Sequence, residues 1–214
     1  GSVRAESVVG GLVGTSFGVI SKCYTTCLVQ SAEPRFLDKQ GRSEIIGGIV
    51  GRNWGEMTNC HATGDVSGEA YMGGLAGRCY EAGAITYSWA TGDVSGESQV
   101  GGLRGGNKGS LVHCYASGRI TGQFQVGGLA GASSGSVNNC YATGNVSASS
   151  QSGGGLIGQN SGVVSECCAT GSVVSARFGG GLVGFNSGKI QRCYSRSQVS
   201  GGFSIGGLAG ENRK

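Results

Sequence analysis

The stretch Gly180-Gly181-Leu182-Val183-Gly184-Phe185-Asn186-Ser187-Gly188 opens with a tripeptide that returns along the whole chain at a nearly fixed period. The third residue of this Gly-Gly-Leu tripeptide, or of its one-residue variant, stands at Leu12, Ile49, Leu75, Leu103, Leu129, Leu156, Leu182 and Leu208. The intervals are 37, 26, 28, 26, 27, 26 and 26 residues. A period this regular indicates one structural unit stacked on copies of itself.

Counted from the leucine, each unit carries three short apolar segments separated by Gly, Asn and Ser. Short β-branched runs bounded by such residues are typical of strands. Three strands in a unit of about 26 residues make one coil of a parallel β-solenoid, with neighbouring coils about 4.8 Å apart. We therefore predict an all-β fold of about eight coils. A right-handed coil is expected ahead of a left-handed one, and a β-propeller is disfavoured because its units run to about 40 residues.

The polar positions of the unit predict the corners of the coil. Glycine there supplies either a positive φ or a close approach between backbones. Asparagine four residues after the leucine tolerates the left-handed region and bonds to nearby backbone, so stacked asparagines are expected to form a ladder along one corner. Five units carry that asparagine: Asn53, Asn107, Asn160, Asn186 and Asn212.

Composition bounds the function. The chain has 46 Gly, one Pro and 13 % charged residues, and its net charge of +4 is spread along the sequence. Because lysine and arginine do not cluster, we expect no nucleic-acid partner. No apolar run reaches the roughly 20 residues of a membrane span, so we expect no membrane insertion. We predict a single domain over residues 1–214, with a non-repeat insertion at about 27–44, cut from a larger protein.

The repeated residues resemble a known family. The stretch 180–188, Gly128-Leu129-Ala130-Gly131 and the later Cys140-Tyr141-Ala142-Thr143-Gly144 look like the GLUG motif repeat. Such repeats occur in bacterial surface adhesins and in non-catalytic regions of IgA-specific metallopeptidases. The resemblance implies export, to the cell surface or as a secreted protein, and no reaction. The His-Glu-x-x-His zinc motif of those peptidases is absent, since neither His61 nor His113 is followed by Glu.

Parity along the strands predicts an exposed aromatic stripe. Side chains alternate between the two faces of a strand, so the residue after the cysteine of each unit should face outward. The candidate ligand-binding residues at or equivalent to this position are Tyr24, Trp89, Tyr115, Tyr141 and Tyr194. Such a stripe serves either as a platform for a glycan or a partner protein, or as cross-strand pairing that stiffens the sheet. A corner that reverses the parity would instead stack these rings in the core. A second group, Tyr71, Phe124, Phe178 and Phe203, is expected to form another patch or to cover a corner.

Six of the nine cysteines occupy one repeat position and should form an inward column. Buried free cysteine behaves as a small hydrophobe, and parallel side chains on adjacent coils suit disulfide geometry badly, so we expect reduced thiols. The column lacks the pattern of a zinc site. Cys168 is the best candidate for an exposed thiol. Arg104 departs from the repeat, and we expect either a partner such as Glu81 or Glu97 or a reversed parity at that strand.

No catalytic, metal or cofactor site is predicted. Asp65 and Asp93 should lie on adjacent coils, where two carboxylates can do acid–base work or hold calcium, but two solvated turn residues are the stronger interpretation. We predict a non-enzymatic adhesin-like or structural module whose partner is a glycan or a host or cell-surface protein. The alternative is a carbohydrate-active β-helix enzyme of the lyase or hydrolase type. Self-association, end to end or side by side, is a further expectation.

Overall fold

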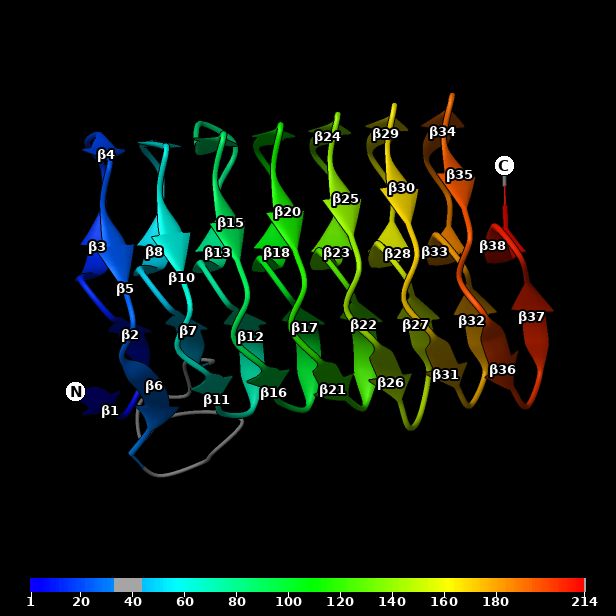
Figure 1. The fold of residues 1–214 in the computed structure, drawn as a ribbon, viewed down its shortest axis with the longest axis horizontal. Helices are drawn as coiled ribbons and strands as arrows, with labels where there is room; N and C mark the ends of the chain where they lie inside the picture. The colour runs from blue at the N-terminus through cyan, green and yellow to red at the C-terminus, as the bar shows by residue number, and fades with distance from the viewer. Residues whose placement is uncertain (33–43, 214) are drawn as a thin grey trace.

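The computed structural model describes residues 1–32 and 44–213, and the chain forms a parallel β-solenoid of about eight coils whose termini lie at opposite ends of the rod (Figure 1). All described strand pairs are parallel and join one coil to the next, as the repeat predicts. No helix occurs in the described ranges, so none there could span a membrane. Most of the predicted insertion, residues 33–43, lies outside the described residues.

The prediction of three strands per coil is wrong, because the coil carries strands of five sheets. Two bends divide the apolar segments. One is the Gly-Gly-Leu tripeptide, and the other is a non-glycine residue in the left-handed region, ten residues after the leucine, or twelve in the longer unit that begins at Leu75. Its φ lies between 49° and 54° in seven coils, at Lys22, Asn59, Tyr87, His113, Asn139, Glu166 and Arg192. The hand of the coil stays a prediction.

Two sheets, A and B, form one half of each coil (Figure 1). Sheet A consists of β1 (Ser2–Ala5), β6 (Leu28–Ser31), β11 (Val66–Ser67), β16 (Val94–Ser95), β21 (Ile120–Gly122), β26 (Val146–Ala148), β31 (Val173–Ser175) and β36 (Val199–Gly201). Sheet B consists of β2 (Val8–Gly10), β7 (Ile45–Gly47), β12 (Ala70–Gly73), β17 (Ser98–Gly101), β22 (Phe124–Gly127), β27 (Ser152–Gly154), β32 (Phe178–Gly180) and β37 (Ser204–Gly206).

Three sheets, C, D and E, form the other half. Sheet C consists of β3 (Val13–Ser16), β8 (Val50–Asn53), β13 (Ala76–Cys79), β18 (Arg104–Asn107), β23 (Ala130–Ser133), β28 (Ile157–Asn160), β33 (Val183–Asn186) and β38 (Ala209–Asn212). Sheet D consists of β4 (Ile20–Ser21), β9 (Glu56–Thr58), β14 (Ala84–Thr86), β19 (Ser110–Val112), β24 (Ser136–Asn138), β29 (Val163–Ser165) and β34 (Lys189–Gln191). Sheet E consists of β5 (Tyr24–Thr25), β10 (His61–Ala62), β15 (Trp89–Ala90), β20 (Tyr115–Ala116), β25 (Tyr141–Ala142), β30 (Cys168–Ala169) and β35 (Tyr194–Ser195).

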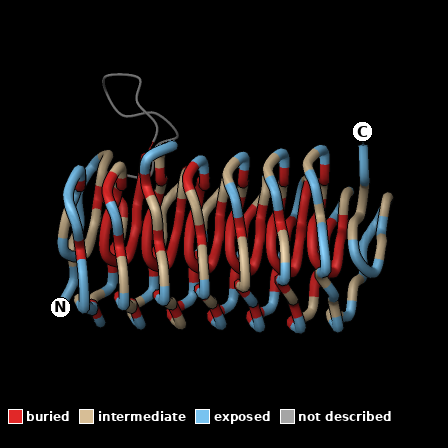
Figure 2. Tube along the Cα trace, turned by 90° about the horizontal axis from the view of Figure 1, so that it is seen from above, coloured by how far each residue is buried: buried red, intermediate tan, exposed pale blue. Residues whose placement is uncertain are grey.

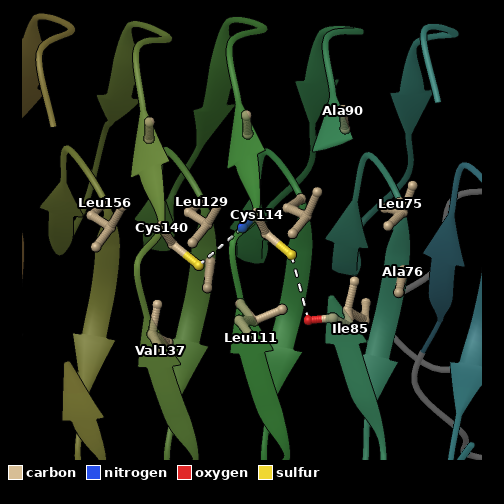
Figure 3. Packing of buried hydrophobic residues seen from close by; sticks show 14 of the residues in the cluster. Leu75, Ala76, Ile85, Ala90, Leu111, Cys114, Leu129, Val137, Cys140 and Leu156 are labelled. Atoms are coloured by element: carbon tan, nitrogen blue, oxygen red, sulfur yellow. Dashed lines mark hydrogen bonds between the residues drawn. The ribbon is translucent and has the colours of Figure 1, made fainter. Parts of the chain in front are cut away.

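The interior is divided into two apolar columns that run along the rod. Figure 2 marks the buried stretches of the chain in red, and the last coil, residues 199–213, has none. The larger column, between sheets C, D and E, holds the repeat leucines and cysteines, such as Leu129 and Cys140 (Figure 3). The smaller column, between sheets A and B, holds the valines and isoleucines that precede the Gly-Gly-Leu tripeptide, such as Val126. Each coil is therefore a two-lobed ring around two cores.

The second glycine of each tripeptide forms the waist between the lobes. A Cβ built on Gly128 would overlap the carbonyl oxygen of Gly155 in the next coil and would lie 2.9 Å from the Cβ of Ala142 across its own coil. The same contacts recur at Gly102, with Gly128 and Ala116. Two neighbours therefore exclude a side chain at this position. One is the backbone of the next coil, and the other is the alanine on sheet E of the same coil.

The glycine two residues after the leucine lets sheets B and C approach each other. A Cβ on Gly131 or Gly158 would come within 3.0 Å of the backbone of Gln99 or Gln125, in the preceding coil. Of the two roles predicted for glycine, close approach is the one found in the described ranges, where no glycine has a φ in the left-handed region. Non-glycine residues take the left-handed corners instead.

The asparagine ladder is confirmed in the last coils. The Nδ2 of Asn160 donates to the Oδ1 of Asn186 at 2.8 Å, and the Nδ2 of Asn186 donates to the Oδ1 of Asn212 at 2.6 Å. Each amide therefore donates to the asparagine of the following coil. Such fully bonded buried amides fix the register of the stack.

Arg104 repairs a break in this ladder. Cys79 occupies the ladder position one coil before Asn107, so no amide there can donate to the Oδ1 of Asn107. The Nη1 of the fully buried Arg104 makes that hydrogen bond instead. Arg104 points inward as its repeat position requires, and its partner is neither Glu81 nor Glu97. Its Nε and Nη2 have no hydrogen-bond partner among residues 1–32 and 44–213.

The cysteine column is a hydrogen-bonding device rather than a covalent one. All nine cysteines are free, as predicted. The amide of Cys114 donates to the Sγ of Cys140 at 3.4 Å, and the thiol of Cys114 bonds the carbonyls of Val112 and Ile85 (Figure 3). Ser88 takes the same position, accepting from the amide of Cys60 at 3.0 Å. A hydroxyl can therefore replace the thiol, which explains the one serine in the column.

Candidate functional site

The predicted stripe faces outward and is one continuous stack of rings over most of its length. Tyr24, His61, Trp89, Tyr115 and Tyr141 follow each other along sheet E, one per coil. Their successive ring centroids are 5.2, 4.2, 5.7 and 5.0 Å apart, and no pair is tilted by more than 11°. Burial between its neighbours raises the pKa of the Tyr115 hydroxyl, and Tyr141 adds to the rise.

Ring stacking limits what the stripe can bind. Within the stack each ring face is covered by the next ring, so a ligand meets ring edges rather than faces. Cys168 interrupts the stack because it stands between Tyr141 and Tyr194 in the register. Cys168, predicted as the best candidate for an exposed thiol, is half-buried. Three other cysteines fall in the same class of exposure: Cys23, Cys27 and Cys193. The most exposed rings of the stripe are Tyr24, at one end of the stack, and Tyr194, beyond the break, which are 63 % and 54 % exposed. The Arg196 guanidinium lies over the Tyr194 ring, 5.7 Å from its centroid.

A groove on the outside of the rod was not predicted. It follows the re-entrant angle between sheets B and C, where the waist draws the two lobes together. Its first hollow, of about 210 Å³, is lined by Tyr71, Arg78, Gln99, Gly106, Asn107, Lys108, Gln125, Ala132, Ser133, Ser134, Gln159 and Ser161. A second hollow, of about 300 Å³, is lined by Gln151, Ser152, Gln159, Arg177, Phe178, Phe185 and Arg213. Gln159 belongs to both hollows, so they form one groove along the solenoid.

The groove collects residues that the repeat leaves variable. The position three after the leucine faces outward from sheet C and is arginine in two coils (Arg52, Arg78), then Gly106, Ala132 and Gln159. The small residues hollow the surface between the long ones. The expected second aromatic patch is found in part, because Tyr71 and Phe178 line the groove, whereas Phe203 is 82 % exposed. In the sequence, the groove could have been recognised from the change in side-chain size at the third position after the leucine.

The aspartates that could have formed an acid–base pair cap turns instead. The Oδ1 of Asp65 accepts the backbone N–H of Asp93 at 2.9 Å, and the Oδ1 of Asp93 accepts that of Arg119 at 2.8 Å. Both side chains are exposed, as predicted for solvated turn residues. His61 is stacked in the aromatic stripe, and His113 stacks on Tyr87 at 4.9 Å. In residues 1–32 and 44–213, no three His, Cys, Asp or Glu side chains are placed to hold a metal ion.

A row of glutamates gives the rod one pH-dependent feature. Burial raises the pKa of Glu69, and the neighbouring Glu44 and Glu97 raise it further. A raised carboxyl pKa means that the folded protein disfavours the ionised form. The resulting destabilisation is absent well below the carboxyl pKa of the unfolded chain, grows as the pH rises from that value to the higher pKa of the folded protein, and is complete above it.

We therefore expect Glu69→Gln to raise the melting temperature at pH 7 and to leave it unchanged at pH 3. Thermal melts at the two pH values measure this. Glu56→Gln removes the same charge at an exposed site and is the control. An equal gain from both variants at pH 7 would show that overall charge, not the glutamate row, is responsible.

Comparison with known proteins identifies the repeat. Residues 43–67 and 122–147 match the family model described as the GLUG motif. The two segments lie in different coils, and each covers most of one unit. The resemblance found in the sequence is thereby confirmed. No curated protein and no solved structure matches the chain.

Proposed function

We propose that this GLUG-motif repeat protein is a non-enzymatic, adhesin-like module of a bacterial surface or secreted protein, which holds a ligand against the outside of a rigid solenoid. The observation that carries the proposal is the unbroken stack from Tyr24 to Tyr141, which locks five coils together on one face. Parallel rings on adjacent strands stiffen a sheet. A stiff rod whose outer groove varies in side chains from coil to coil favours a binding function over a catalytic one.

The stack gives the proposal its first test. Tyr115→Ala removes a central ring, and we expect it to lower the free energy of unfolding by about 1–2 kcal/mol, since an aromatic pair adds roughly 0.5–1.5 kcal/mol beyond its buried area. We expect ligands found in a glycan-array screen of the wild-type chain to bind Tyr115→Ala unchanged. Urea titration and the repeated array measure the two effects. Loss of binding at unchanged stability would instead make the stripe the ligand platform.

One observation favours the alternative, a carbohydrate-active enzyme. Tyr71, Arg78 and Lys108 line one groove, and side chains of these types serve polysaccharide lyases. The Arg78 guanidinium lies 4.7 Å above the ring of Tyr71 and 5.2 Å from that of Tyr80, and a guanidinium does not lose its proton in proteins. Lys108 lies 3.9 Å from Glu81 on the rim. These contacts support a binding role, so the enzyme stays second.

Self-association belongs to the same proposal. Apolar side chains are exposed on the first described coils, such as Phe17 at 74 %, and on the last, such as Phe203 at 82 %. Contact between such faces would join copies end to end. A sedimentation coefficient that stays constant over a wide concentration range would count against it.

A further inference from the structure

We propose that the groove between sheets B and C binds a linear polysaccharide that carries carboxylates, such as a chain of uronic acids. The inference rests on the proposed binding function and names its site and ligand class. It is drawn from the shape of the groove, its hydrogen-bonding groups and its charge, each of which is visible in the side chains that line the two hollows.

The shape fits one chain rather than a globular partner. The two hollows lie in line and share Gln159. Each is near or below the roughly 300–1,000 Å³ that encloses a drug-sized ligand, so each takes only a short part of a longer molecule. The lining residues are spaced by the coil, about every 4.8 Å, so an extended chain passes one lining position per coil, and Gln99 and Gln125 present the same side chain on two neighbouring coils.

The hydrogen-bonding groups suit hydroxyl-rich ligands. Three glutamines, Gln99, Gln125 and Gln159, project into the first hollow from successive coils, and the amide of Gln125 donates to that of Gln159. A carboxamide both donates and accepts, as a sugar hydroxyl does. Gln99 and Gln125 keep these side chains although their φ values of 50° and 54° favour glycine or asparagine. Ser134 and Ser161 add exposed hydroxyls at the rim.

The charge of the groove favours an anionic ligand. Among the described residues, no carboxylate lines either hollow, whereas Arg78, Lys108, Arg177 and Arg213 do. Within the described residues Arg78 makes no ion pair, and its planar guanidinium is held by two rings. Such a fixed fork binds a carboxylate through two parallel hydrogen bonds. Arg52, one coil earlier in the same column, extends the positive strip, and its buried Nε has no hydrogen-bond partner in the described part of the chain.

Grooves that bind a nucleic-acid strand also contain cations and aromatic rings, but they carry more uncompensated positive charge than this groove does. Two of the four lining cations are compensated, Lys108 by Glu81 at 3.9 Å and Arg213 by Glu211 at 2.5 Å. A strand with one phosphate per nucleotide needs a continuous cationic track. Amides and hydroxyls outnumber uncompensated cations here, which favours a ligand with many hydroxyls and fewer charges.

The test measures binding of size-defined polygalacturonate oligomers, with neutral dextran and single-stranded oligothymidylate as comparison ligands. Arg78→Gln removes the central cation, and we expect at least tenfold weaker binding of polygalacturonate, because the charge and the forked pair of hydrogen bonds are lost together. Gly106→Gln fills the hollow without changing charge, because a Cβ there meets only side-chain atoms, the nearest being Gln99 Oε1 at 3.1 Å. It should weaken binding at least as much.

Arg119→Gln is the matched control, since it removes an exposed arginine that lies outside the groove. It should leave affinity within about twofold. Unchanged melting temperatures show that the variants are folded. If Arg78→Gln and Gly106→Gln leave the affinity for polygalacturonate unchanged, the groove is not the binding site, but the proposal of an adhesin-like module still stands. Equal or tighter binding of oligothymidylate, or no binding of polygalacturonate, overturns the ligand class. If no glycan or cell-surface protein binds at all, the proposed function fails as well.

Discussion

Gly128→Ala is expected to lower the free energy of unfolding by about 3 kcal/mol or more, at the upper end of what overpacking costs. The added methyl would overlap the Gly155 carbonyl of the next coil and press on Ala142 across the waist. Neither contact can yield locally, because both belong to backbone or to short side chains on paired strands. Urea denaturation followed by tryptophan fluorescence measures the loss.

Gly207→Ala is the matched control. Gly207 is the second glycine of the last tripeptide, but its chain neighbours apart, no described residue has a heavy atom within 4 Å of the position that its Cβ would take. We expect a change within about 0.5 kcal/mol, as for most surface substitutions. Similar losses at both glycines would mean that backbone conformation, and not the stacking of the next coil, requires glycine in the tripeptide.

A substitution of the buried Arg104 should stabilise the protein rather than destabilise it. Arg104→Met is expected to raise the free energy of unfolding by about 1–3 kcal/mol. It removes a fully buried cation that forms no ion pair with a described carboxylate and whose Nε and Nη2 bond to no described residue. Methionine fills a similar volume between Ala76 and Ala130, its neighbours on sheet C. The gain is reduced because Asn107 loses its donor.

Cys79→Asn should recover that loss. An asparagine at this position can donate to Asn107 as Asn160 donates to Asn186. We expect the double variant Cys79→Asn, Arg104→Met to exceed the sum of the two single changes by about 1 kcal/mol, the net value of one hydrogen bond. Strict additivity would contradict the ladder repair, and a destabilising Arg104→Met would show that the guanidinium has a partner of opposite charge.

Much of the fold could be predicted because residues at the same position of the repeat stack on one another in successive coils. The inward cysteines, the outward tyrosines and the asparagine ladder follow from residue positions counted within one unit, since each coil repeats the environment of the last. The number of strands could not be predicted. The bend before each cysteine uses residues such as Lys22 and Glu166, which carry no sequence signal for a left-handed φ.

The candidate site was predictable only in part. Outward parity located Tyr24, Trp89, Tyr115 and Tyr141, but not that their faces cover one another. The groove was missed because it arises between two sheets, from the depth of the waist and from the contrast between Arg78 and Gly106 in one column. Neither feature belongs to a single strand, so a pattern read along the chain does not show it.

We expect the rod to hold an acidic polysaccharide without cleaving it. The most direct measurement is the chain-length distribution of polygalacturonate after prolonged incubation with the protein, taken from the same mixture in which co-elution on a sizing column reports binding. We predict that the polysaccharide co-elutes with the wild-type chain but not with Gly106→Gln, and that its length is unchanged. Shortened chains or newly formed unsaturated ends, absent from the Gly106→Gln mixture, would contradict the account and make the groove an active site.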